Sequence, residues 1–165
     1  MSIAYLLLGG NKGDVITALR KACVSIEKQI GTVLLQSSFY ESEAWGFNSD
    51  NFINQVMCVD TNLSPKQLLQ QIHQIESNAG RVRTKNKEYE ARTLDIDILF
   101  YDDSIIETND LNIPHPRMHE RRFTLLPLNE IAPDFIHPVF RLSINQLLQQ
   151  TTDRGKVDKL NFRIR

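Results

Sequence analysis

The sequence predicts an α+β fold, in which an antiparallel β-sheet carries helices on one face. Two segments have the spacing of amphipathic helices, and four short runs of apolar or alternating residues have the character of strands. The chain has 165 residues, of which 41% are hydrophobic and 24% charged. This composition is typical of a globular protein, and a single domain over residues 1–165 with its own core is expected.

The first part of the chain supplies a strand, a helix and two further strands. Residues 3–9 ("IAYLLLG") form a compact apolar run closed by a glycine-rich turn, which predicts a strand. Residues 15–30 have apolar side chains at helical spacing, and Gly31 is expected to stop that helix. "TVLLQSSFY" (32–40) and "NFINQVMCVD" (51–60) then predict two strands.

A second helix and a fourth strand follow. Ser64 and Pro65 supply an N-cap and a first-turn proline, and Gln67 is placed to complete a capping box. Gly80 is expected to end this helix. The run "LDIDILFY" (94–101) alternates, so that Leu94, Ile96, Ile98 and Phe100 are expected on one face of a strand. The resulting order, βαββαβ, is the ferredoxin-like arrangement.

The remaining residues predict additions to this arrangement. A short strand is expected at 105–106, followed by a proline-rich corner at 114–116. A helix at about 118–130 and a short C-terminal helix beginning near Ser143 are also expected. These elements could pack against the sheet edge or against its open face, and the sequence leaves both arrangements open.

Two aspartates interrupt the fourth predicted strand. Side chains two residues apart on a strand share a face, so Asp95 and Asp97 should point the same way, roughly 7 Å apart. A solvated face would tolerate the two like charges, whereas a divalent cation would turn their repulsion into attraction. Mg²⁺ is usually held by one or two carboxylates plus substrate phosphates, and a carboxylate pair can also serve two ions. The pattern alone leaves both interpretations open.

A basic segment leads directly into this strand. "GRVRTKNKEYEART" (80–93) carries five cationic side chains and two anionic ones. The planar guanidinium of arginine matches phosphate oxygens in two-point contacts. A solvated loop is the alternative, but the position next to two carboxylates favours a site for a magnesium-bound triphosphate.

Composition and charge exclude several other classes of protein. The formal net charge of −1 gives no overall field that would attract nucleic acid or an anionic membrane. The apolar start "MSIAYLLLGGN" is too short for a membrane span or a signal peptide, so a cytoplasmic protein without a membrane partner is expected. Cys23 and Cys58 match no metal-ligand spacing and are expected to be reduced.

The ordered motifs of the chain resemble those of a known family. "AYLLLGGNKGD", "SSFYESEAWGF", "NFINQV", "GRVR…ARTLDIDILFY" and "IPHPRMHERRFTLLPLNEIAP" follow one another as in the 6-hydroxymethyl-7,8-dihydropterin pyrophosphokinases of folate biosynthesis. The resemblance covers about residues 3–160 and implies the ferredoxin-like fold derived above. It also implies transfer of the β,γ-pyrophosphoryl group of ATP to the hydroxymethyl oxygen of the pterin, with release of AMP. A monomer that binds ATP and the pterin, but no nucleic acid, is expected.

The resemblance further implies roles for individual residues. Asp95 and Asp97 would bind two Mg²⁺ ions, and Arg83 and Arg92 would act with them in catalysis. The ATP site would comprise Leu69, His73, Glu76, Arg81, Arg83, Arg92, Ile98, His115 and Arg121. The pterin site would comprise Ser42, Glu43, Trp45, Gly46, Phe52, Asn54, Tyr89, Asp95 and Phe123. Within it, Phe52 and Phe123 would stack on the two faces of the flat ring.

Two other classes of protein are compatible with parts of the pattern. A nucleotidyltransferase also combines a glycine-rich turn with an Asp-x-Asp strand, but it would release pyrophosphate and leave AMP on its acceptor. A ferredoxin-like RNA-binding module would need stacking aromatics and a basic sheet face. The strand "LDIDILF" presents carboxylates instead, which repel phosphate unless a metal ion intervenes.

Overall fold

The computed structural model describes residues 1–43, 51–80 and 94–161. The first elements are β1 (Ser2–Gly10), α1 (Val15–Gln29), β2 (Gly31–Gln36), β3 (Tyr40–Ser42), β4 (Phe52–Thr61), α2 (Pro65–Asn78) and β5 (Asp95–Tyr101). They are followed by β6 (Ile106–Glu107), β7 (Asn112–Ile113), the 3₁₀ helix η1 (Met118–Glu120), α3 (Arg122–Ile131), α4 (Ile144–Gln150) and β8 (Val157–Lys159).

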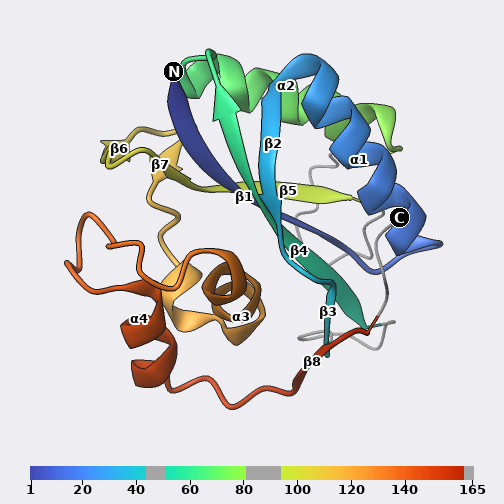
Figure 1. Ribbon diagram of the computed structural model, residues 1–165. Coiled ribbons are helices and arrows are strands. Elements are labelled where there is room, and N and C mark those ends of the chain that lie inside the picture. Colours follow the sequence, from blue (N-terminus) through green and yellow to red (C-terminus); the bar gives the residue numbers. More distant parts are fainter. Residues whose placement is uncertain (44–50, 81–93, 162–165) are drawn as a thin grey trace.

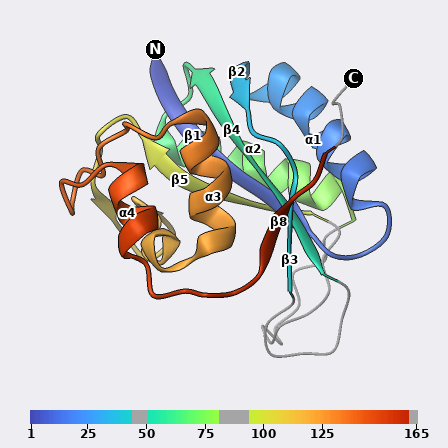
Figure 2. The same ribbon diagram turned by 60° about the horizontal axis from the view of Figure 1, so that its bottom comes forward.

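The main sheet is antiparallel and has the order β5-β1-β4-β3-β8, with β2 also paired to β4. Helices α1 and α2 cover one face of this sheet, and α3 and α4 lie on the opposite side (Figure 1, Figure 2). The strands β6 and β7 form a separate two-stranded hairpin. The predicted ferredoxin-like α+β arrangement is confirmed, with α3, α4 and β8 added to it.

The sheet separates two hydrophobic cores. The core under α1 and α2, here called the first core, includes Leu6, Leu8, Leu19, Ile26, Leu68 and Ile72. The core under α3 and α4, the second core, includes Leu7, Val56, Phe100, Leu125, Leu128 and Ile144. Alternate residues of β1 therefore face different cores, as the period of a strand requires. Of the two arrangements that the sequence left open, the structure therefore shows the second: the C-terminal helices pack on the open face of the sheet and not on its edge.

Strand β5 does not alternate throughout as the sequence predicts. Its pairing with β1 shifts, so that Leu6 faces Ile98 whereas Tyr5 faces Phe100. Leu99 is the extra residue of this β-bulge, and both Leu99 and Phe100 belong to the second core. The prediction that Phe100 shares a face with Ile98 is wrong, because one inserted residue reverses the alternation beyond it.

The bulge has consequences on both sides of β5. Tyr101 packs against the first core, and its hydroxyl donates a hydrogen bond to the Leu63 carbonyl oxygen at 2.6 Å. Asp95 and Asp97 come before the bulge and pair in regular register with β1. They therefore share one face of the sheet, as predicted.

Gly31 has a different role from the one that the sequence predicts. Helix α1 ends at Gln29 with Ile30 as its C-cap, and Gly31 is already the first residue of β2. A Cβ atom on Gly31 would overlap the backbone carbonyl of Asp60 on β4. Glycine is needed here for close approach of two strands, and not for a left-handed helix stop.

The predicted strand over residues 32–40 is interrupted. Residues 37–39 separate β2 from β3, and the Ser37 hydroxyl accepts a hydrogen bond from the Val56 backbone N–H at 2.9 Å. The serine side chain thus takes the place of a backbone acceptor in the ladder.

The predicted capping residues of α2 and the predicted start of α4 near Ser143 are confirmed. Ser64 and Gln67 form the reciprocal capping box of α2, and Gly80 follows that helix with φ +89°. Ser143 caps α4.

The predicted helix at about 118–130 is divided into η1 and α3. The carboxylate of Asp153 accepts a hydrogen bond from the Arg122 backbone N–H at 2.9 Å, and the Arg122 guanidinium donates to the Gly155 carbonyl oxygen at 2.8 Å. Asp153 therefore satisfies a donor at the start of α3 from far along the chain. The same C-terminal segment continues into β8, which pairs with β3 and was not predicted.

No helix in the described ranges is long and apolar enough to cross a membrane. Cys23 and Cys58 are free thiols, as predicted.

His137 joins the second core to the loop before α4. Its ring is 2% exposed and lies 5.5 Å from the Phe100 ring. Its Nδ1 atom accepts hydrogen bonds from the backbone N–H groups of Val139 and Phe140 at 3.1 and 3.2 Å. Burial, and to a lesser extent the charge of His119, lowers the pKa of His137 to about 4.

This lowered pKa predicts a loss of stability in mild acid. Between pH 6.5 and pH 4 the unfolded chain binds a proton at His137 that the folded chain does not, so stability falls as the pH falls through this window. For one such histidine the slope approaches about 1.4 kcal/mol per pH unit. Urea unfolding of wild type and His137→Gln at several pH values between 5 and 7 measures it. The variant should lose stability less steeply, and an equal slope in both proteins would contradict the assignment.

Candidate active site

A row of residues crosses the sheet and begins at the first aspartate. Asp95 on β5 pairs with Gly9 on β1, Gly9 pairs with Asn54 on β4, and Asn54 pairs with Tyr40 on β3. Directly opposed residues of neighbouring strands project from the same face. Asp95, Asn54 and Tyr40 therefore share the face on which α3 lies. Asp97 belongs to this face too, one row further on.

Gly9 lets two members of this row approach each other. A Cβ atom on Gly9 would overlap the side-chain oxygen of Asn54, so the amide of Asn54 occupies the space above Gly9. From there the amide lies between β4 and the strand that carries Asp95. The sequence placed Gly9 in a glycine-rich turn. The signal for its role is a glycine within an apolar strand, which often marks the close approach of another group.

The amide of Asn54 has an unused donor. Its side chain is 5% exposed, and its Nδ2 atom has no hydrogen-bond partner within the described residues. Leaving a buried donor without a partner costs about 1–3 kcal/mol. Such a group, on the same face as a carboxylate pair, is suited to recognise a polar edge of a ligand.

The backbone between the two aspartates is fixed from the other side by helix α2. Glu76 is 2% exposed, and its carboxylate accepts a hydrogen bond from the Ile96 backbone N–H at 2.9 Å. Because β5 lies at the end of the sheet order, its second edge needs acceptors other than a strand. Glu76 supplies one and so holds β5 in place between Asp95 and Asp97.

The residues predicted to line the nucleotide site from α2 are spaced one turn apart. Leu69, His73 and Glu76 follow at intervals of four and three residues, so they lie along one side of the helix. Leu69 is partly buried against the first core. Ile98 is 5% exposed and belongs to the same core, so its role in the nucleotide site stays a prediction.

His115 lies at the proline-rich corner, after the cis Ile113–Pro114 bond. Its backbone N–H donates to the Leu99 carbonyl oxygen of β5 at 3.0 Å, and its Nδ1 accepts from the Arg117 backbone N–H at 3.2 Å. Burial, with a further contribution from Arg121, lowers the pKa of His115 to about 4, although Asp95 opposes this shift. At neutral pH His115 is therefore an uncharged imidazole whose proton sits on Nε2, within electrostatic reach of Asp95 and Arg121.

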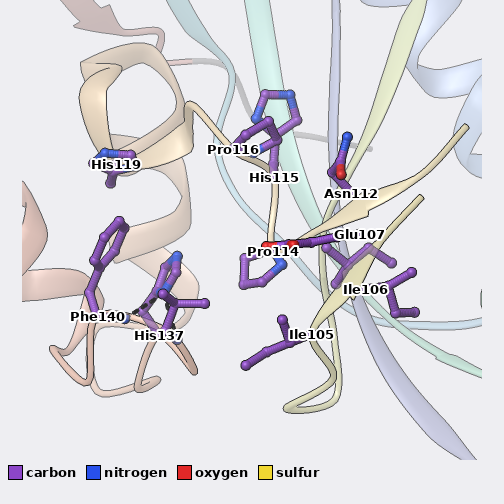
Figure 3. A pocket seen from close by; sticks show the side chains of 12 residues that line it. Ile105, Ile106, Glu107, Asn112, Pro114, His115, Pro116, His119, His137 and Phe140 are labelled. Carbon is purple, nitrogen blue, oxygen red and sulfur yellow. Dashed lines mark hydrogen bonds between the residues drawn. The ribbon is translucent and has the colours of Figure 1, made fainter. Parts of the chain in front are cut away.

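His115 also lines a cavity of about 280 Å³ between the β6–β7 hairpin and residues 137–140 (Figure 3). Isoleucine, proline and aromatic side chains make up most of its wall, among them Ile105, Pro114 and Phe140. Among the residues that the structure describes, no lysine or arginine lines it. A polyphosphate needs cationic partners, so the face that carries Asp95, and not this cavity, is the candidate active site.

The start of helix α3 contributes two predicted site residues. Arg121 is the N-cap residue, and its guanidinium carbon lies 5.5 Å from the centre of the Phe123 ring. Phe123 is partly buried and packs against the second core. Both residues therefore enter the site from α3, opposite the sheet.

Besides Asp95, three predicted pterin residues lie on the sheet, and Glu43 directly follows one of its strands. Ser42 is buried on β3 and pairs with the half-buried Phe52 on β4, on the same face as Asn54. Glu43 follows β3 and is exposed. The structure thus gathers Ser42, Phe52 and Asn54 on the sheet below α3.

Several predicted residues lie outside the described ranges, and their roles stay predictions. These are Trp45, Gly46, Arg81, Arg83, Tyr89 and Arg92.

The donor set on β5 fits a hard divalent cation. Asp95 and Asp97 are half-buried and share a face, although no group of three metal-binding side chains exists within the described residues. Two carboxylates are sufficient for Mg²⁺ where substrate phosphates complete its coordination. The magnesium assignment stays a prediction.

The fold and the site together define a class of protein. A ferredoxin-like sheet presents two carboxylates, a buried amide, a neutral histidine and an arginine on one side, which is typical of an enzyme that handles a phosphorylated substrate.

Comparison with known proteins gives the family. Residues 5–133 match the family model described as 7,8-dihydro-6-hydroxymethylpterin-pyrophosphokinase. A 2-amino-4-hydroxy-6-hydroxymethyldihydropteridine pyrophosphokinase of Aquifex aeolicus is 39% identical over 153 residues, 92% of this chain and 94% of the relative. The protein of the same name from Haemophilus influenzae is 39% identical over 98% of this chain and 99% of its own. The chain therefore belongs to the 6-hydroxymethyl-7,8-dihydropterin pyrophosphokinase family.

Solved structures give the same fold. The Plasmodium falciparum HPPK-DHPS structure with pteroate matches with a TM-score of 0.74 at 18% identity over 90% of this chain. The match spans 44% of that longer protein, so this chain corresponds to less than half of its length.

The contact between Gly9 and Asn54 can be tested by substitution. In Gly9→Ala the new methyl group should displace the Asn54 amide, and binding of the pterin should weaken about tenfold, as expected for loss of one buried hydrogen bond. Ala18→Gly, at a half-buried position of α1, serves as a destabilising control away from the site. Calorimetric titration with the pterin and an unreactive ATP analogue measures the effect, and unchanged affinity in a folded Gly9→Ala protein would contradict it.

Proposed function

We propose that this chain transfers the β,γ-pyrophosphoryl group of ATP to the hydroxymethyl oxygen of 6-hydroxymethyl-7,8-dihydropterin. The products are AMP and the pterin diphosphate, an intermediate of folate biosynthesis. Membership of the pyrophosphokinase family supports this reaction. The observation that supports it is the common face of Asp95, Asp97 and Asn54, on which two carboxylates suited to a metal-bound phosphate lie near an amide suited to the pterin edge.

In the proposed complex Asp95 and Asp97 would hold two Mg²⁺ ions. When bound, these ions supply positive charge to the ATP phosphates. The half-buried positions of both carboxylates, and the hydrogen bond from Ile96 to Glu76 between them, support a preorganised site.

The side chains around the carboxylates provide binding and orientation. Arg121 supplies a guanidinium for phosphate oxygens, and neutral His115 offers its Nε2 proton as a donor. Asn54 donates to the pterin from Nδ2, which has no partner among the residues that the structure describes, and Phe123 offers an aromatic face. Arg83 and Arg92 are proposed to neutralise charge on the transferred group.

The reaction is proposed as direct in-line attack of the hydroxymethyl oxygen on the β-phosphorus of ATP. The O–P bond to the pterin forms as the bond between the β-phosphorus and the oxygen that bridges it to the α-phosphate breaks. AMP leaves with that oxygen, and the proton of the hydroxyl group is released to solvent. Positioning and charge stabilisation are the main contributions of a protein to phosphoryl transfer. Within this proposal the chain acts as a monomer in the cytoplasm, which stays a prediction.

The assay is incubation of the protein with ATP, Mg²⁺ and the pterin, followed by chromatographic detection of AMP. A nucleotidyltransferase would release pyrophosphate instead and join AMP to the acceptor. Formation of AMP should depend on all three components, and its absence would contradict the proposed function.

Loss of one carboxylate should abolish most of the turnover while the fold remains. For Asp97→Ala we expect kcat to fall by about 100-fold or more, because a preorganised ligand of the Mg²⁺ ions that would bind the phosphates is removed. Asp103→Ala, which changes an exposed aspartate after β5, is the matched control and should retain normal activity. AMP release gives the rate, and thermal unfolding verifies the fold. Near-normal turnover in Asp97→Ala would remove this residue from the metal site.

A further inference from the structure

Glu130 connects helix α3 to the sheet through both oxygens of its carboxylate. The Tyr40 hydroxyl donates to Oε1 at 2.6 Å. The Ser38 backbone N–H and hydroxyl donate to Oε2 at 2.9 and 3.2 Å. The Lys159 ammonium on β8 lies 3.7 Å from Oε1. One side chain thus binds three segments of the sheet region, by charge-assisted hydrogen bonds that are stronger than neutral ones.

Tyr40 is placed beside the predicted pterin residues. It is 6% exposed and pairs directly with Asn54, which is 5% exposed. Opposed side chains of paired strands have Cβ atoms about 4.5–5.5 Å apart. Burial and the neighbouring Glu130 carboxylate both raise the pKa of the Tyr40 hydroxyl, so it remains a hydrogen-bond donor at physiological pH.

Glu130 also shares a side of α3 with Phe123. The two residues are seven positions apart, which is two helical turns, and so about 10 Å along the axis. The helix packs on β3 and β4. Helix α3 is fixed to Tyr40, the neighbour of Asn54, near its C-terminal end, so this contact also determines how Phe123 lies relative to the sheet at the other end of the helix. Figure 2 shows α3 lying over this side of the sheet.

We propose that Glu130 is a positioning residue of the pterin site: by fixing Tyr40 relative to α3 it sets the spacing between Asn54 on the sheet and Phe123 on the helix. Glu130 itself touches neither substrate nor metal in this scheme. The inference rests on the proposed function, since it concerns the acceptor side of the same site.

The proposal predicts different effects on the binding of the two substrates. Asp95 and Asp97 stand on β5, and Glu76 fixes that strand independently of Glu130. Removal of the Glu130 carboxylate should therefore weaken binding of the pterin more than binding of ATP. A residue that only stabilises the fold would have no such preference.

The test compares Glu130→Ala, Glu130→Gln, Tyr40→Phe and the double variant Glu130→Ala/Tyr40→Phe with wild type. Glu41→Gln is the matched control, because Glu41 is the next residue of β3 and points to the opposite face. Dissociation constants for the pterin and for an unreactive ATP analogue are measured by calorimetry, together with KM and kcat. Thermal unfolding shows which variants are folded.

For Glu130→Ala and for Tyr40→Phe we expect the pterin dissociation constant to rise about tenfold and that of the ATP analogue to change less than about twofold. Glu130→Gln keeps an oxygen acceptor for Tyr40 and should restore part of the affinity. The double variant should bind the pterin no more weakly than Glu130→Ala, because both changes break one interaction.

Equal weakening of both substrates would show a general structural role and overturn the proposal, as would normal pterin affinity in folded Tyr40→Phe. Tyr40→Phe keeps the ring and loses only the hydroxyl, so it provides the test even if Glu130→Ala does not fold. If wild type produces no AMP, the proposed function fails. If wild type is active and every variant binds the pterin normally, only the role of Glu130 fails.

Discussion

The antiparallel register of β5, β1 and β4 is the constraint on which the site depends. It places Asp95 and Asn54 on either side of Gly9 and on the same face of the sheet. A slip of one residue in either pairing would turn a carboxylate or the amide into the first core. Gly9 is therefore part of the site although it has no side chain, since any Cβ atom there would displace Asn54.

The two faces of the sheet differ in the side chains that they carry and in how far helices cover them. The face under α1 and α2 is filled by aliphatic side chains, and buried Glu76 on α2 holds the edge strand that carries the aspartates. The opposite face is only partly filled by α3 and α4, whose core begins at Leu7, Val56 and the bulge of β5. Beyond this core the same face carries polar residues. The residues of the second core and the polar residues of the candidate site therefore lie on the same face of the sheet, because side chains two positions apart on a strand point the same way.

His115 and Arg121 place a neutral and a cationic hydrogen-bond donor near Asp95. His115 is kept uncharged by burial and by Arg121, so it can donate a hydrogen bond without adding charge beside that arginine. Helix α3 is held near both of its ends: its first backbone N–H, at Arg122, donates to Asp153, and its own Glu130 accepts a hydrogen bond from Tyr40 on β3. The helix that follows Arg121 is thereby fixed by contacts with distant parts of the chain.

Local sequence determined the element order, the capping box at Ser64 and the common face of Asp95 and Asp97, because strand and helix periods and caps are short-range properties. Ordered motifs determined the family, which the comparisons confirmed. Only the tertiary structure decided that Phe100 faces the second core. It also decided that Gly31 allows close approach of the β4 backbone, and that Gly9 leaves space for the Asn54 side chain. Bulges, close approaches and long-range acceptors depend on which strands pair, and pairing involves residues far apart in the chain.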